Sequence, residues 1–324
     1  MIPVAKAGGE FKGGIADFFR RRARRILPPY YACLAVTAIL YALRYAISAH
    51  SSHKAPAFSI YFYLWYSLTH LLLVQNIFHE YSQSLNGALW TVATEWQIYF
   101  VFPFILAPIF KKWGPFAALF FGYAVGLATY PFDFRDACFW YVGLFALGMA
   151  GADMCFSPKP WLKFNLNSLL WISIVSAAFS TVCRYILTIN PGDDPLTDLF
   201  TGVCAASFIT YLVRSSPLDL GAGKNRLRGF LSSRPCVTLG AFSYSLYLIH
   251  VPIIVLALTC LGTTKISGDH KFLLMYLFVM PLCLVLAYGF HLLFEKPFMA
   301  PVPKPSDRSL PLSEQAKEIQ PSGA

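Results

Sequence analysis

The chain has 324 residues, of which 56% are hydrophobic and 17% aromatic, and its mean hydropathy is +0.54. This composition excludes a single water-soluble core. The formal charge of +10 does not indicate nucleic-acid binding, because the basic residues lie in short loops rather than on one water-exposed surface. Apolar runs of roughly 17 to 25 residues recur, each long enough to cross a bilayer. The alternating segments of a membrane barrel are absent. We therefore predict an all-α, polytopic helix bundle in the lipid bilayer.

Residues 1–16 form a polar N-terminal segment, with charges and glycines where a signal peptide would carry its apolar core. Five arginines follow directly, in the run from Arg20 to Arg25. Arginines that abut a membrane span place that end of the span in the cytoplasm. Guanidinium groups also bind phosphate in a bidentate manner, so Arg21, Arg22 and Arg25 are candidates for binding a phosphate-bearing substrate or an anionic lipid. A pure topology signal remains an alternative.

The second apolar run, Phe58 to Phe78, decides the topology. If it crossed the bilayer, the basic loop from Arg214 to Arg234 would lie outside, against the positive-inside rule. We interpret the run as re-entrant or interfacial, which leaves about eight true spans and places Lys54 and Lys224 on opposite sides of the membrane. The predicted spans are Leu27–Ile47, Trp90–Phe110, Phe116–Tyr130, Cys138–Ala150, Leu166–Leu187, Leu196–Val213, Val237–Leu261 and Phe272–Phe294. Residues 17–297 thus form the membrane domain, and 298–324 a disordered cytoplasmic tail.

Glu95 places a carboxylate inside the apolar, helix-length stretch from Leu85 to Pro103. An acid at membrane depth costs roughly 2.5 to 3.5 kcal/mol on insertion scales, so such residues usually mark a functional site. Tyr99, four residues later, shares the same helical face and could help Glu95 to orient a base or bind an acceptor hydroxyl. The alternative is a buried acid that serves only helix packing.

Four motifs carry a family resemblance. They are RRARRILPPYY (21–31), LNGALWTVATEWQIYFVFP (85–103), LGAFSYSLYLIHVP (239–252) and FEKP (294–297). Their order resembles that of the membrane-bound acyltransferase-3 family, over about Asp17 to Pro297. The resemblance implies a multi-pass enzyme of the bacterial inner membrane that moves an acyl group, typically acetyl, from acyl-coenzyme A to a hydroxyl of a sugar, polysaccharide or glycolipid. Acyl-coenzyme A is then the donor substrate, and no bound cofactor is expected.

The family usually begins with two further spans, the first bearing an arginine and, about ten residues on, a histidine regarded as catalytic. The present sequence starts just ahead of the basic run and shows neither span. We expect either an upstream start or a truncated, non-catalytic copy. A transporter or flippase is a further alternative, although such folds often show an internal repeat with matching broken helices, and none is found here.

His250 is the best remaining candidate for a base, because it lies midway along an apolar span and histidine has the most suitable unperturbed pKa. A neutral histidine bonded to Ser243, Tyr247 or a facing helix is the alternative. The catalytic candidates are Glu95, Tyr99 and His250, and the substrate-binding candidates are Asn86, Trp90, Ser243 and Tyr247. His70 and His291 are interpreted as structural. Glu295 lies at a cytoplasmic helix end, where it could pair with an arginine, and a simple interfacial acid is the alternative. No metal site is predicted, since His50 and His53 lack a third ligand and the eight cysteines are scattered singly.

Overall fold

The computed structural model describes residues 2–6, 10–11, 13–50, 60–129, 132, 134–187, 194–215, 226–262, 264 and 267–299, and no strand occurs among them. The α-helices are α1 (Ile2–Lys6), α2 (Gly14–His50), α3 (Ile60–Leu71), α4 (His79–Ser82), α5 (Leu89–Val101), α6 (Ala107–Thr129), α7 (Tyr141–Phe156), α8 (Leu166–Leu187), α9 (Pro195–Arg214), α10 (Arg226–Leu231), α11 (Arg234–Ala241), α12 (Ser243–Gly262), α13 (Gly268–Leu274) and α14 (Met280–Phe290). Short 3₁₀ or π-helical segments are η1 (Gln75–Ile77), η2 (Phe102–Leu106), η4 (Arg135–Ala137), η5 (Met275–Val279), η6 (His291–Glu295) and η7 (Lys296–Phe298).

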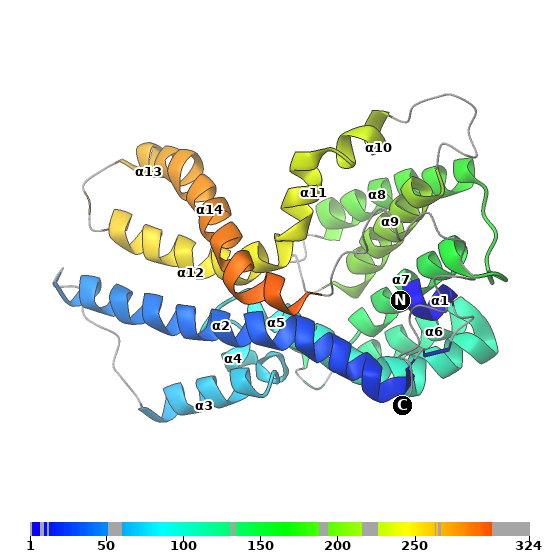
Figure 1. Cartoon of the computed structure of the whole chain (residues 1–324), viewed down its shortest axis with the longest axis horizontal. Coiled ribbons are helices and arrows are strands. Elements are labelled where there is room, and N and C mark those ends of the chain that lie inside the picture. Colours follow the sequence, from blue (N-terminus) through cyan, green and yellow to red (C-terminus); the bar gives the residue numbers. More distant parts are fainter. Residues whose placement is uncertain are drawn as a thin grey trace, which may run out of the picture.

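The 37-residue helix α2 is roughly 55 Å long and runs along most of the molecule (Figure 1). Helices α3, α12 and α14 lie beside its C-terminal half, and α6 to α9 gather near its N-terminal half. Helix α5 lies at the centre, between these two groups. Its side chains therefore meet elements from both halves of the chain.

Six helices are long and apolar enough to cross a membrane, by length and composition, in the described part of the chain. The longest, Leu89–Thr129, is broken at Gly114, whose φ of 83° is readily adopted only by glycine. The shorter apolar helix Tyr141–Phe156 adds a further segment. The predicted spans lie largely on helices in the described part of the chain, although Val237–Leu261 covers α11 and α12 with a break at Phe242. The prediction of a polytopic helical membrane protein is confirmed.

Among its described residues, the run from Phe58 to Phe78 contains the 12-residue helix α3 and the 3₁₀ segment η1. At 1.5 Å per residue the described part of α3 covers roughly 18 Å, less than one crossing requires. The chain leaves the helix at Leu73, which has a positive φ of 54°. Its length agrees with a re-entrant or interfacial segment. The predicted sides of Lys54 and Lys224, like the histidine pair at 50 and 53, concern side chains outside the described residues.

The predicted polar N-terminal segment includes the short helix α1, which packs against α7. Lys6 of α1 lies over the Phe156 ring of α7, with 5.6 Å between its Nζ and the ring centroid. The predicted tail from 298 falls outside the described residues from 300 onward, and the last described residues belong to η7 and Met299.

Small residues allow α6 and α7 to pack closely. A Cβ atom on Gly122 would lie 2.3 Å from the Gly143 backbone nitrogen, and one on Gly126 would lie 2.5 Å from the Trp140 nitrogen. Gly122 and Gly126 are four residues apart, the spacing with which small residues let membrane helices approach. This contact holds α7 and α6 together on the side of α5 that faces the N-terminal half of α2.

Candidate active site

A chain of three polar side chains links α5 to α2. The Tyr99 hydroxyl donates to Oε1 of Glu95, one turn earlier in the same helix. Nη1 of Arg22 in α2 donates to the same tyrosine oxygen over 3.2 Å, and the guanidinium carbon lies 4.7 Å from the centroid of the Tyr99 ring. The arginine therefore contacts Tyr99 both by a hydrogen bond and by a cation–π interaction. The structure brings together Glu95, Tyr99 and Arg22, all three predicted as site residues.

Exposure differs along this chain of residues. Tyr99 is buried, with 2% of its surface exposed, and Arg22 is half-buried. The Glu95 side chain is exposed although its helix is apolar enough to span a membrane. One carboxylate oxygen is bonded to Tyr99, and the group remains open to a ligand.

Thr91 and Tyr247 connect α5 to α12 by a hydrogen bond between their hydroxyl groups. Thr91, Glu95 and Tyr99 are spaced four residues apart, so they share one face of α5. On α12, the Tyr244 hydroxyl donates to the Ile26 carbonyl of α2 over 3.3 Å, and Tyr244 lies within electrostatic reach of Glu95. The polar face of α5 thus points toward the seam between α2 and α12.

His250 lies one helical turn beyond Tyr247, with 5.8 Å between the two ring centroids. Its Nδ1 atom is 2.8 Å from the Tyr247 carbonyl oxygen and 3.1 Å from that of Leu246. Since a carbonyl oxygen only accepts, Nδ1 carries the proton and Nε2 is the basic nitrogen. No hydrogen bond or ion pair joins His250 to Glu95 within the described ranges. The backbone of α12, and not Glu95, therefore orients the imidazole.

The remaining arginine candidates lie at the surface of α2. Arg21 forms an i,i+4 ion pair with Asp17, and both Arg21 and Arg25 are exposed. Arg25 lies within electrostatic reach of Tyr99. Arg22 is therefore half-buried and contacts the polar face of α5, whereas the other arginines of the run are exposed.

Two of the substrate-binding candidates are placed at the periphery. Ser243 is exposed at the start of α12 and donates to the Gly240 carbonyl over 3.0 Å. Trp90 is half-buried at the start of α5, with 6.0 Å between its ring centroid and that of Tyr141. Tyr247 alone among the substrate-binding candidates contacts the polar face of α5.

Asn86 is only 1% exposed, and its polar atoms bond to the protein itself. Its Nδ2 donates to the Leu248 carbonyl of α12 over 2.8 Å and to Sγ of Cys33 in α2 over 3.4 Å, while Oδ1 accepts from the Ala88 N–H over 3.1 Å. These bonds join the start of α5 to both neighbouring helices. In this structure Asn86 holds α5 in place.

Comparison with known proteins decides the family. A family model described as an acyltransferase domain, acyltransferase-3, matches residues 9–292. The chain belongs to the acyltransferase-3 family. The predicted resemblance is confirmed over the whole membrane domain except its last residues.

Two curated bacterial relatives illustrate the similarity. The chain is 28% identical over 310 residues to "Putative peptidoglycan O-acetyltransferase YrhL" of Bacillus subtilis, with 90% of this chain and 46% of that protein covered. It is 24% identical over 261 residues to "O-acetyltransferase OatA" of Staphylococcus aureus, with 74% of this chain and 41% of that protein covered. The chain therefore spans under half the length of the curated relatives it matches. No solved structure matches.

The sequence did not predict a second polar cluster, which is formed by Ser245, His291 and Glu295. Ser245 of α12 donates to Oε2 of Glu295 over 2.5 Å, and Nδ1 of His291 lies 2.8 Å from the same oxygen. All three side chains are buried, with Ser245 at 0% and Glu295 at 1% exposed. The i,i+4 spacing of His291 and Glu295 was a sequence signal for this pair. Ser245 carried no such signal, because its partner lies 50 residues away.

Buried amides form a third cluster below the start of α5. Gln97 Nε2 donates to Asn76 Oδ1 over 2.8 Å and to the Leu73 carbonyl over 3.0 Å, while Asn76 Nδ2 donates to the Thr94 hydroxyl over 2.9 Å. Gln75 Nε2 donates to the Leu89 carbonyl over 3.1 Å. The bond from Gln97 satisfies the Leu73 carbonyl just beyond the end of α3, and the other bonds join η1 to α5.

Proposed function

We propose that this chain is part of a membrane O-acyltransferase that moves an acyl group, acetyl in the first instance, from acyl-coenzyme A to a hydroxyl of a sugar, polysaccharide or glycolipid. The observation that carries the proposal is the match to the acyltransferase-3 family over residues 9–292. Both relatives described above are named as O-acetyltransferases, and one is named for peptidoglycan. The polar face of α5 also supports this function, as does His250, whose Nε2 has no hydrogen bond with any residue that the structure describes.

In this proposal His250 Nε2 takes the proton from the acceptor hydroxyl. The hydroxyl oxygen attacks the thioester carbonyl carbon, a C–O bond forms, and the carbonyl oxygen becomes an oxyanion. Collapse of the tetrahedral intermediate breaks the C–S bond, and the imidazolium returns its proton to the leaving coenzyme thiolate. The tautomer set by the Tyr247 and Leu246 carbonyls presents the correct nitrogen for both transfers.

Glu95 has a different role from the base in this proposal. Its open carboxylate accepts a second hydroxyl of the acceptor and so orients the attacking oxygen, while Tyr99 fixes the carboxylate rotamer. Tyr247 of α12 contacts Thr91 at the start of α5 and lies one turn from His250, so it borders the acceptor in this proposal. Trp90, next to Thr91, lies beside Tyr141 of α7. The bonds made by Asn86 give it a positioning role there, since they hold the start of α5 against α2 and α12.

The donor approaches from the arginine run. Arg22 joins this run to Glu95 through Tyr99, and Arg21 and Arg25 present exposed guanidinium groups on the same stretch of α2. Guanidinium groups bind phosphate oxygens in pairs, which suits the phosphates of coenzyme A. The donor thioester would then lie near the Tyr99 end of the polar face.

Acetylation of the surface polysaccharide in the host cell tests the proposal. The gene is deleted, then restored as wild type or as Glu95→Gln, and the O-acetyl content of isolated cell-wall and lipid-linked sugars is measured. The proposal expects O-acetyl groups to disappear on deletion, to return with wild type, and to stay low with the glutamine variant at equal protein level. Unchanged O-acetyl content after deletion would contradict it and favour a transport role.

A further inference from the structure

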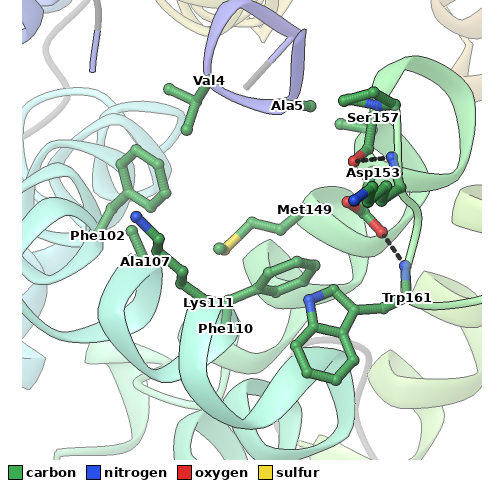
Figure 2. Close-up of a pocket in the computed structure, with 13 residues that line it drawn as sticks. Val4, Ala5, Phe102, Ala107, Phe110, Lys111, Met149, Asp153, Ser157 and Trp161 are labelled. Atoms are coloured by element: carbon green, nitrogen blue, oxygen red, sulfur yellow. Dashed lines mark hydrogen bonds between the residues drawn. The ribbon is translucent and has the colours of Figure 1, made fainter. Parts of the chain in front are cut away.

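A cavity of about 310 Å³ lies beside the polar face of α5 but outside it, between α1, the start of α6, the end of α7 and the following loop. Figure 2 shows its walls: Phe102, Ala107 and Lys111 on one side, Asp153 and Trp161 on the other, and Val4 of α1 above. Most of the lining is apolar, and Met149 and Phe110 complete the floor. The volume is at the lower end of ligand pockets, enough for a short flexible chain but not for a nucleotide.

Two lysines give the cavity its charge. Lys111 and Lys159 both line it, and neither ammonium group has a hydrogen bond or ion pair with any residue that the structure describes. Figure 2 shows the Lys111 side chain extending along the wall toward Phe102. The neighbouring Lys112 differs, since its Nζ lies 4.7 Å from the centroid of the Trp113 ring and it does not line the cavity. Free ammonium groups beside an apolar space favour a ligand with an anionic head and an apolar chain.

One carboxylate also faces this space. Asp153 is 8% exposed, and its Oδ2 accepts the Trp161 backbone N–H over 2.8 Å. This bond fixes the loop that carries the indole wall. The indole in turn packs on Gly114, where a Cβ atom would lie 3.0 Å from Cε3 of Trp161. Asp153 therefore shapes the cavity, and the two lysines leave it with a net positive charge.

Lys111 lies between the predicted spans Trp90–Phe110 and Phe116–Tyr130, and Lys159 between Cys138–Ala150 and Leu166–Leu187. The positive-inside rule assigns both connections, and hence the cavity, to the cytoplasmic side in the predicted topology. Phe102 lines it and lies one turn beyond Tyr99 on the same helical run. The ring centroids of Phe102 and Phe18 are 5.4 Å apart, and Phe18 in turn lies under the Arg22 guanidinium. A single aromatic layer thus separates the cavity from the Arg22–Tyr99–Glu95 chain.

We propose that this cavity is a binding site for a phosphate ester carried on a flexible chain, with Lys111 and Lys159 on the phosphate and the mostly apolar walls around the chain. Two sources offer this chemistry: the phosphopantetheine arm of a coenzyme A thioester, whose chain carries two amide groups, and an acidic phospholipid of the cytoplasmic leaflet, whose chains are apolar. The proposal stands apart from the assignment of acyl transfer to Glu95 and His250, and either can fail alone.

Binding to the intact chain in nanodiscs tests the site. One arm titrates coenzyme A into protein held in pure phosphatidylcholine discs. The other compares the unfolding midpoint in pure phosphatidylcholine discs with that in discs containing phosphatidylglycerol. The variants are the pair Lys111→Gln with Lys159→Gln and the matched control Lys112→Gln. Ala152 also lines the cavity, and Ala152→Leu is the cavity-filling variant.

The expected result is saturable binding, or a midpoint rise, in one of the two arms for wild type and for Lys112→Gln. The double lysine variant weakens that response about tenfold or more, because charge-assisted bonds to the phosphate are lost. Ala152→Leu weakens the same response without changing charge. A response to coenzyme A identifies the donor arm as the source, and one to phosphatidylglycerol identifies the lipid. No response in either arm, or equal responses from the double variant and Lys112→Gln, would overturn the proposal.

Discussion

Glu95 and Glu295 both lie in helices long and apolar enough to span a membrane, and their surroundings differ in opposite ways. Glu295 is 1% exposed and receives hydrogen bonds from Ser245 on another helix and from His291 on its own. Glu95 is exposed, and its hydrogen bond comes from Tyr99 on its own helix, with Arg22 reaching only the tyrosine. The first carboxylate is enclosed by protein donors, and the second is left open.

We propose that this difference separates a structural acid, Glu295, from a functional one, Glu95. A buried carboxylate is tolerated when its acceptor sites are filled, and Glu295 then fastens η6 to α12. An exposed carboxylate in an apolar helix still bears its insertion cost, roughly 2.5 to 3.5 kcal/mol, and folding does not need it. We infer that ligand binding retains Glu95, whereas packing retains Glu295. The open site comprises Glu95, Tyr99, Arg22 and the nearby His250, and the closed cluster comprises Glu295, Ser245 and His291.

The largest effect is expected at the base of the open site. His250→Gln should reduce acyl transfer about 10³-fold, or about 4 kcal/mol in barrier, because a general base contributes on this scale. The unfolding midpoint should stay near that of wild type, since the imidazole bonds only to carbonyls of its own helix turn. Transfer is measured as O-acetyl content per folded molecule. Transfer within a few fold of wild type would exclude His250 as the base.

Removal of the closed carboxylate should act on stability instead. Glu295→Ala leaves the Ser245 hydroxyl and the His291 N–H buried without an acceptor, which should lower the free energy of unfolding by about 2 to 4 kcal/mol. Glu95→Ala is the matched control and should cost less than about 1 kcal/mol, because its site is exposed. Denaturant titration in detergent measures both. Equal losses of unfolding free energy in Glu295→Ala and Glu95→Ala would contradict the proposal that only Glu295 serves the fold.

Arg22→Gln should weaken donor use by about tenfold, because a charge-assisted contact worth about 1.4 kcal/mol is removed at the entrance of the open site. Arg20→Gln, at an exposed position of the same run, is the matched control and should leave donor use unchanged. The apparent KM for acetyl-coenzyme A in membrane vesicles reports the effect. A donor KM unaffected by Arg22→Gln would leave this arginine only its role in topology.

The smallest expected effect is a difference in unfolding free energy between variants of two nearby serines. Ser245→Ala removes one bond to Glu295 and should lower the free energy of unfolding by about 1 kcal/mol. Ser243→Ala, two residues earlier and exposed, should change it by less than about 0.5 kcal/mol. Both are measured in the same titration. A larger loss of unfolding free energy for Ser243→Ala than for Ser245→Ala would mean that Ser245 does not hold α12 to η6.

Much of the architecture was predictable because membrane depth fixes helix length and composition. Apolar runs located the helices, and loop charges singled out Phe58–Phe78, where the structure has the short helix α3. The pairing of Glu95 with Tyr99 followed from i,i+4 spacing, which is a local property. The family assignment followed from motifs whose order the sequence displays.

The features that could not be predicted from the sequence depend on contacts between residues that lie far apart along the chain. The bond between Asn86 and the Leu248 carbonyl spans 162 residues, so no local pattern predicted that Asn86 joins α5 to α12. Ser245 was passed over for the same reason, while Ser243 shared an i,i+4 spacing with Tyr247 yet bonds to the Gly240 carbonyl. The cavity beside Lys111 requires α1 and α7 to meet, which no local pattern encodes.

The central claim is that Glu95 serves the reaction and Glu295 serves the fold. It is tested most directly by measuring acyl transfer per folded molecule and the unfolding midpoint for Glu95→Gln and Glu295→Gln in the same host membrane. We expect Glu95→Gln to keep the midpoint and lose transfer by about 10²-fold or more, on the order of 3 kcal/mol. We expect Glu295→Gln to lower the midpoint and to keep transfer per folded molecule within a few fold. Normal transfer by Glu95→Gln, or loss of transfer by Glu295→Gln at an unchanged midpoint, would contradict the account.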